Sequence, residues 1–211
     1  NTEIRHFDLS DPDSITKKIL SDIDVVIHAA ALVHNPKANK NAHRTLNFDA
    51  TKHLFKTCEE AEVNKFIFIS TVGVYGLSSS KKKISIRTKT CPVSAYEIAK
   101  LDSEKILLRS NSSTAISIIR LPLVYGENAP GNYGLLEKVA KTRLPLPFLN
   151  TRNKRSIVSV ELVAKVINAD VTNMVVLICV VFLIGLILAG YRLWKVSKQL
   201  NAAYNYDANE S

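Results

Sequence analysis

The sequence of 211 residues contains little cysteine, glycine or proline, and each shortage excludes a class of protein. Its cysteines, Cys58, Cys91 and Cys179, lie far apart and form no CxxC pair. This spacing argues against a disulfide framework or a zinc module and fits a reducing compartment. Seven glycines and seven prolines are too few for a collagen-like or low-complexity chain. Apolar residues make up 46% of the sequence, so the chain can form a packed core.

Acidic residues are also in the minority, since 19 Asp and Glu face 28 Lys and Arg, for a net charge of +9. A basic protein can bind nucleic acid. However, the densest basic run lies in the Ser-rich stretch 78–89, which is typical of a solvated surface loop. No nucleic-acid motif accompanies this run, so we expect no nucleic-acid partner.

Short apolar runs alternate with amphipathic stretches over residues 1–170, a length typical of one domain. Predicted strands occupy residues 4–7, 24–30, 65–70 and 115–122. Predicted helices occupy residues 12–22, 40–62 and 92–110. This alternation predicts a parallel sheet covered on both faces, which is a doubly wound α/β fold.

Residues 174–190, MVVLICVVFLIGLILAG, contain no charged side chain. Counted from Val171 to Trp194, the segment exceeds the roughly 20 residues that a bilayer span needs. A buried core helix is the alternative, but such a helix usually carries a polar stripe. We therefore predict a transmembrane helix over residues 171–194 and a polar tail over 195–211. Because the chain begins without a charged and then apolar segment, we expect a membrane-anchored protein whose large domain is cytoplasmic.

Tyr96 and Lys100 are four residues apart within a predicted helix and therefore share one of its faces. A lysine ammonium beside a phenol favours the phenolate, so the tyrosine can exchange a proton near neutral pH. Upstream, one predicted strand ends at the hydroxyl of Thr71 and another ends in the small residues 29–31. Nucleotides bind at such carboxyl ends of parallel strands.

Together these segments resemble the extended short-chain dehydrogenases/reductases, in particular the NAD-dependent nucleotide-sugar epimerase/dehydratase group that includes UDP-glucose 4-epimerases. The motifs that carry the resemblance are HAAALVH (28–34), NFDAT (47–51), FISTVGVYG (68–76), YEIAK (96–100), RLPLVYGENAPGN (120–132) and RSIVSV (155–160). They fall in the family's order and spacing. The resemblance implies a partial Rossmann-like domain over residues 1–168.

The resemblance also implies a role for particular residues. The catalytic residues would be Thr71, Tyr96 and Lys100. Besides Tyr96 and Lys100, the NAD (or NADP) site would use Asp8, Ala29, Ala30, Ala31, Asn47, Pro122 and Leu123. Besides Thr71, a UDP-sugar would contact Asn132 and Arg155, whose guanidinium suits phosphate oxygens.

Some of these assignments have plainer alternatives. Thr71 could be a strand-end hydroxyl, and Arg155 could be surface charge, with Arg152 and Lys154 competing for its role. His28 and His34 have no cysteine or acidic ligand cluster nearby, so we predict packing or hydrogen-bonding roles and no metal site.

The activity implied by the family is a hydride shuttle at C4 of a UDP-sugar, giving an epimerase or a dehydrogenase/ketoreductase. The 4,6-dehydratase branch carries an Asp-Glu pair after the threonine, where this chain has Val72 and Gly73, so dehydration is disfavoured. Residues 120–148 most resemble members that act on UDP-linked N-acetyl or 6-deoxy sugars in O-antigen synthesis.

Two departures from the family affect these expectations. No glycine precedes Gly73, so the GxxGxxG loop that cradles the dinucleotide pyrophosphate is missing. Residues 161–173 lead directly into the apolar block instead of a substrate-binding lobe, and residues 174–211 faintly resemble the start of polyprenyl-phosphate glycosyl-1-phosphate transferases. A truncated or fused reading frame and an incomplete gene model both explain this.

The missing loop has a consequence for activity. For the polypeptide as written we expect little or no turnover, and the alternative function is an inactive membrane-anchored remnant. The resemblance leaves open a homodimer through the helices at 40–62 and 92–110.

Overall fold

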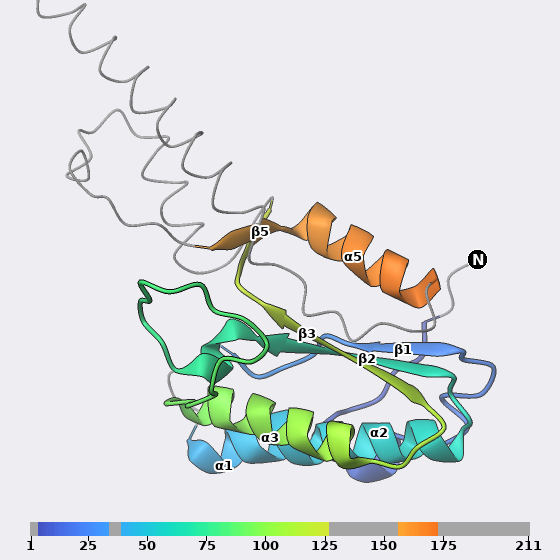
Figure 1. Ribbon diagram of the computed structural model, residues 1–211. Coiled ribbons are helices and arrows are strands. Elements are labelled where there is room, and N and C mark those ends of the chain that lie inside the picture. The colour runs from blue at the N-terminus through green and yellow to red at the C-terminus, as the bar shows by residue number, and fades with distance from the viewer. Residues whose placement is uncertain (1–3, 34–38, 127–155, 173–211) are drawn as a thin grey trace, which may run out of the picture. The chain divides into compact units, whose positions relative to one another are not determined.

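The computed structural model describes residues 4–33, 39–126 and 156–172 (Figure 1). The chain divides into two compact units. One unit is formed by residues 1–121 and 165–180, and the other by residues 122–164 and 181–211.

The first unit is built on a three-stranded parallel sheet in the order β1-β2-β3. The strands are β1 (Val25–His28), β2 (Lys65–Thr71) and β3 (Ala115–Leu121). Val25 pairs with Lys65, and Lys65 pairs with Ala115, so the register begins level at the amino end of the sheet. The strands predicted at 24–30, 65–70 and 115–122 and the parallel arrangement are therefore confirmed.

Helices α2 (Ala50–Glu60) and α3 (Ala95–Arg109) pack against one another and lie over one face of this sheet (Figure 1). The main core forms beneath them, where Leu54, Phe55 and Cys58 of α2 meet Phe66 and Phe68 of β2. The rings of Phe55 and Phe66 meet edge to face at 5.3 Å between centroids. Because side chains alternate along a strand, the odd-numbered residues of β2 point to the opposite face.

On that opposite face, Ile67 is fully buried and Lys65 pairs with Asp170. Asp170 belongs to α5 (Val160–Thr172), whose residues from Lys165 onward are part of the first unit. Both faces of the sheet are therefore covered, as the doubly wound fold requires.

The predicted helix over 40–62 is present but is not uniform. It consists of α1 (Lys40–His43), the π-helical segment η2 (Arg44–Asp49) and α2, which follow one another without a break. Side-chain caps fix where the helices begin. The Asn39 side chain accepts a hydrogen bond from the Ala42 N–H at the start of α1.

The helix predicted at 92–110 begins at Ala95 because Ser94 and Glu97 form a capping box. The Ser94 hydroxyl accepts from the Glu97 N–H at 3.2 Å, and Glu97 Oε2 accepts from the Ser94 N–H at 2.9 Å.

Two predictions for the N-terminal segment are wrong. Residues 4–7 form no strand, and Ile4 and Phe7 are 75% and 42% exposed, because among the described residues β1 pairs only with β2. Residues 12–22 form no α-helix either. They form the short 3-10 helix η1 (Pro12–Ser14), capped by Asp11, and then a series of turns. β-Branched residues and serine in this stretch favour turns over a helix, while Ile15 and Leu20 still reach the core.

The second unit contains β4 (Leu123–Tyr125) and β5 (Ile157–Ser159), which form a parallel pair. Helix α5 begins directly after β5, at Val160. The predicted transmembrane helix lies outside the described residues except for its first two positions, and the predicted tail lies wholly outside them. In the described portion of the chain, none of the helices combines the length and the apolar character that a membrane crossing requires.

Candidate active site

Lys100 lies in α3 against the carboxyl half of β2 and is 2% exposed. Its Nζ donates a hydrogen bond of 2.8 Å to the Ile69 carbonyl and lies 4.4 Å from the centre of the Phe68 ring. Burial lowers the pKa of Lys100 to about 8, while the carboxylate of Glu104 acts in the opposite direction. The side chain is thus held at the sheet and still carries its proton for most of the time at neutral pH.

Tyr96 lies one turn before Lys100 and is half-buried. Its ring meets the His43 ring edge-on, with 6.4 Å between centroids. Burial, with the charge of Glu97, raises the pKa of Tyr96, contrary to the lowered value that the Tyr96–Lys100 spacing predicts. Lys100 donates its hydrogen bond to the Ile69 carbonyl, and burial of the phenol determines the direction of the shift. The raised pKa makes Tyr96 a neutral phenol that can donate a proton.

Thr71 ends β2 two residues after Ile69 and therefore lies at the carboxyl end of the sheet. Its Oγ1 accepts a hydrogen bond from the Gly73 N–H at 3.1 Å and caps the 3-10 helix η3 (Val72–Tyr75). Helix α3 packs against both β2 and η3. The plainer strand-end interpretation thus describes one contact of this hydroxyl, and a substrate role remains a prediction.

The loop after β1 is fixed by Asn47, which lies in the π-helical segment η2 and is 1% exposed. Asn47 Oδ1 accepts from the Leu32 N–H at 2.7 Å, and its Nδ2 donates to the Leu32 carbonyl at 2.9 Å. Of the three alanines before Leu32, Ala29 and Ala30 are exposed. Their backbone at the carboxyl end of β1 is open to close approach by a ligand.

The Asn47 main-chain carbonyl makes two further contacts. It accepts hydrogen bonds from Thr51 Oγ1 at 2.8 Å and from Ser103 Oγ at 3.0 Å. Ser103 is on α3, so this carbonyl joins the helix of Tyr96 and Lys100 to the clamp on the β1 loop. π-Helical bulges such as η2 are common at functional sites.

His28, the last residue of β1, is buried, and its Nε2 lies 2.9 Å from Thr51 Oγ1. Burial, with the charge of Lys100, lowers its pKa to about 4, so His28 is neutral at physiological pH. The predicted packing and hydrogen-bonding role of His28 is confirmed. Within the described ranges, no group of three or more His, Cys, Asp or Glu side chains could hold a metal ion. His34 lies outside those ranges.

Sequence reasoning missed a buried polar network next to these residues. Glu104, 1% exposed, accepts from Arg120 Nη2 at 2.6 Å and Arg120 Nε at 3.0 Å, and from Ser70 Oγ at 2.5 Å. Arg120 Nη1 also donates to the Tyr75 hydroxyl at 2.8 Å. The spacing of Glu104, four residues after Lys100 on the same helix face, was the signal in the sequence that could have found it.

The remaining predicted site residues are not brought to this cluster by any described contact. Asp8 is exposed, and its Oδ1 accepts from the Ser10 N–H and hydroxyl, which lowers the pKa of Asp8. Pro122 is buried and Leu123 begins β4, both in the second unit. Asn132 and Arg155 lie outside the described residues.

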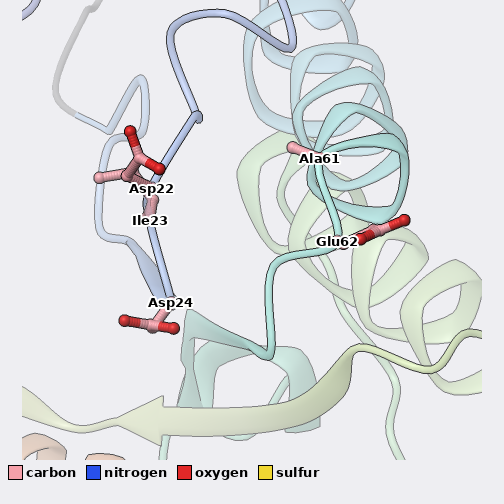
Figure 2. A pocket seen from close by; sticks show the side chains of 5 residues that line it. All are labelled: Asp22, Ile23, Asp24, Ala61 and Glu62. Carbon is pink, nitrogen blue, oxygen red and sulfur yellow. The ribbon is translucent and has the colours of Figure 1, made fainter.

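A hollow at the opposite, amino end of the sheet is unrelated to this cluster. It is lined by Asp22, Ile23, Asp24, Ala61 and Glu62. Figure 2 shows that the Glu62 side chain points away from those of Asp22 and Asp24. The carboxylates do not converge on a common point, and Asp24 already accepts a hydrogen bond from Asn64.

Among curated proteins, the UDP-glucose 4-epimerase of Vibrio cholerae is 33% identical to this chain over 151 residues. The match covers 67% of this chain and 45% of that protein, so the chain spans less than half of this relative.

Two solved structures share the fold. One is RMD from Pseudomonas aeruginosa complexed with NADPH, with a TM-score of 0.67 and 19% identity over 81% of this chain and 62% of that chain. The other is the Bordetella bronchiseptica enzyme WbmG in complex with NAD and UDP, with a TM-score of 0.64 and 20% identity over 78% of this chain and 52% of that chain. At these identities the likeness establishes the Rossmann-like parallel α/β fold.

The order of the motifs, the parallel sheet and the cluster at its carboxyl end agree with a match at the level of the family. The family model described as "NAD dependent epimerase/dehydratase family" matches residues 1–173. This match covers most of the 211 residues, and the chain belongs to the NAD-dependent epimerase/dehydratase family.

Proposed function

We propose that this chain carries the catalytic half of an NAD-dependent enzyme that acts at C4 of a UDP-sugar, as an epimerase or dehydrogenase/ketoreductase, in surface-polysaccharide (O-antigen) synthesis. The observation that carries the proposal is the cluster at the carboxyl end of the sheet. Tyr96 and Lys100 share one face of α3, and Lys100 is bonded to β2 two residues before Thr71. The 33% identical relative, a UDP-glucose 4-epimerase, supports the substrate class.

The residues of the first unit fit a dinucleotide beside this cluster. Ala29 and Ala30 are exposed after β1, and Asn47 fixes the loop that carries them. NAD (or NADP), when bound, supplies the hydride acceptor and donor. The complexes of the two structures that share the fold, with NADPH and with NAD and UDP, support this cofactor and a UDP-linked substrate.

The three catalytic residues have distinct roles in this proposal. Tyr96 as the phenolate accepts the proton of the sugar 4-hydroxyl when C4 is oxidised, and as the neutral phenol, which its raised pKa favours, it donates a proton to the 4-keto oxygen when C4 is reduced. Lys100 supplies the positive charge that favours the phenolate once its Nζ turns from the Ile69 carbonyl toward Tyr96. Thr71 exchanges its capping contact with Gly73 for a hydrogen bond to the same sugar oxygen.

The other residues assigned by resemblance complete the proposed site. Asp8 contacts the adenine, Pro122 and Leu123 lie near the nicotinamide, and Asn132 and Arg155 bind the UDP-sugar diphosphate.

The apolar segment within residues 171–194 anchors the protein, with the domain over 1–168 on the cytoplasmic side. A homodimer would use the helices within 40–62 and 92–110. Resistance to carbonate extraction tests the anchor, and light scattering of the detergent-solubilised chain tests the dimer.

The experiment that tests the catalytic proposal is calorimetric NAD binding by the full chain, followed by turnover of UDP-glucose and UDP-N-acetylglucosamine. The proposal predicts NAD binding in both the parent chain and Tyr96→Phe, and turnover, at whatever low rate the missing glycine loop allows, only in the parent. If a sample that is folded by circular dichroism binds no NAD, the proposal fails, and the chain is the inactive remnant instead.

A further inference from the structure

A single carboxylate lies where the elements that carry the three proposed catalytic residues meet. Glu104 is on α3, and its oxygens accept hydrogen bonds from Ser70 on β2 and Arg120 on β3. Arg120 extends the network to η3 through the Tyr75 hydroxyl, and its guanidinium lies 4.9 Å from the centre of the Tyr75 ring. Four elements are therefore joined through Glu104 and Arg120.

The network touches the catalytic cluster at two points. Ser70 is the residue before Thr71, so its hydrogen bond to Glu104 fixes the backbone from which the Thr71 hydroxyl projects. Glu104 also lies one helical turn after Lys100, as Lys100 does after Tyr96, which places the three side chains on one face of α3. Glu104 is the group whose negative charge opposes the effect of burial on Lys100.

The surroundings of Lys100 make this carboxylate distinctive. On α3 the titratable residues three or four positions from Lys100 are Tyr96, Glu97 and Glu104. From the sheet it is faced by the Ile69 carbonyl, the Phe68 ring and the neutral His28. Beyond Glu104 comes the second cation, Arg120. Glu97 accepts hydrogen bonds from the Val93 and Ser94 N–H groups at the start of α3, so Glu104 is the carboxylate left to balance the charge of Lys100.

We propose that Glu104, held by Arg120 and Ser70, is a positioning residue for the hydride-shuttle reaction. It fixes the backbone of Thr71 relative to α3, which carries Tyr96 and Lys100, and it is the counter-charge of the Lys100 ammonium. This inference rests on the proposed function. It adds a residue that acts through Lys100 and touches neither substrate nor cofactor.

The test measures the titration of Lys100 directly in the full, detergent-solubilised chain. The protein is labelled with ¹³C-lysine, the ¹³Cε resonance of Lys100 is assigned with Lys100→Arg, and its shift is followed with pH. No cofactor or substrate is needed, so failure of the proposed function, seen as no NAD binding, is separate from failure of this inference.

The key variant is Glu104→Gln, which keeps the size of the side chain and removes its charge. If Glu104 supplies the counter-charge, the midpoint of Lys100 moves down from about 8. If Glu104 serves only to hold the fold, its loss loosens the site, Lys100 gains water, and the midpoint moves up toward the ordinary value of 10.5. An upward or absent shift overturns the inference.

A second variant guards against misfolding, because Glu104→Gln leaves Arg120 without its carboxylate. The double variant Glu104→Leu/Arg120→Leu removes both charges, a replacement that buried ion pairs often tolerate. We again expect a downward shift of the Lys100 midpoint. Lys105→Gln, an exposed position on the same helix, is the matched control and should leave the midpoint unchanged.

Discussion

The two ends of the central sheet each contain a buried ion pair, but the two pairs are built differently. At the carboxyl end, Glu104 receives hydrogen bonds from two side chains, and its partner Arg120 donates also to Tyr75. At the amino end, Lys65 Nζ lies 3.1 Å from Asp170 Oδ1 and donates to the Asp170 main-chain carbonyl.

The two pairs differ more in the hydrogen bonds that their carboxylates receive than in how deeply they are buried. Asp170 is fully buried, and within the described part of the chain neither of its carboxylate oxygens receives a hydrogen bond of good geometry. The pair at the amino end therefore depends on the charge of Lys65, whereas Glu104 keeps a donor when one partner is lost. The Glu104–Arg120 pair is thus part of a hydrogen-bonded network at the site. The Lys65–Asp170 pair, which lacks such hydrogen bonds to its carboxylate among the described residues, attaches α5 to the sheet.

The largest effect on the free energy of unfolding should come from breaking the Lys65–Asp170 pair. Lys65→Met leaves the Asp170 carboxylate buried without its counter-charge and should lower the free energy of unfolding by about 4 kcal/mol. Arg120→Met should cost only about 2 kcal/mol, because Glu104 retains the Ser70 hydroxyl. Urea denaturation of both variants measures the difference. Equal losses would contradict the comparison, and Lys65→Met/Asp170→Leu should recover most of the stability as a control.

The next effect depends on pH and belongs to the carboxyl end. The pKa of His28 is about 4 in the folded protein, and its ordinary value, which we take for the unfolded chain, is 6.5. Above pH 6.5 both the folded and unfolded states hold His28 neutral, so it makes no pH-dependent contribution. As the pH falls from 6.5 through 4, the unfolded state binds the proton first and the folded protein loses about 3 kcal/mol of stability.

The variant His28→Gln should reduce this acid sensitivity. The unfolding free energy, measured between pH 4 and 7, should fall less steeply than in the parent chain. His6→Gln, at an exposed position, is the control and should preserve the parent's slope. An unchanged slope in His28→Gln would show that His28 takes up its proton at the same pH in both states.

A smaller effect is expected from the clamp on the β1 loop. Asn47→Ala removes both hydrogen bonds to Leu32 and leaves those main-chain groups without their partner, which should cost about 2 kcal/mol. Because the loop carries Ala29–Ala31, affinity for NAD should fall as well. Asn39→Ala removes the cap of α1 without touching this loop. It should therefore keep the NAD affinity, and a similar loss in both variants would count against the clamp.

The smallest effect concerns the start of α3. Ser94→Ala removes one half of the capping box and should cost about 1 kcal/mol in thermal or urea unfolding. Ser94→Asp should restore most of this stability, because a carboxylate can accept the same hydrogen bond. A full loss in both variants would indicate that Ser94 acts through something other than the cap.

Much of the fold could be predicted from the sequence because the signals were local. The β-branched run before His28 and the apolar run 65–70 fixed two strands, and the spacing of Leu54 and Cys58 fixed a helix face. The segment at 4–7 also carries apolar residues, but a strand needs a bonded neighbour, and composition carries no information about neighbours. At 12–22 the apolar spacing was satisfied by consecutive turns as well as by a helix.

In the candidate site, too, the sequence predicts some residues but not the contacts between them. Tyr96, Lys100 and Thr71 follow from short motifs, and the structure brings their elements together. The direction of the Lys100 side chain depends on the Ile69 carbonyl, and the raised pKa of Tyr96 depends on its burial in the folded chain; no motif encodes either. The partners of Glu104 come from 34 and 16 residues away in the sequence, so only the folded chain shows them as a network.

The π-helical segment between α1 and α2 takes more residues per turn than an α-helix, because its hydrogen bonds span five residues instead of four. Deleting one residue within 44–49 would therefore turn this segment toward a regular α-helix, while His43 stays beside Tyr96 and Leu54 and Phe55 stay in the core. The deletion would act mainly on Asn47 and its bonds to Leu32. Evolution can thus add or remove the clamp on the β1 loop by a single residue, without repacking the interior of the domain.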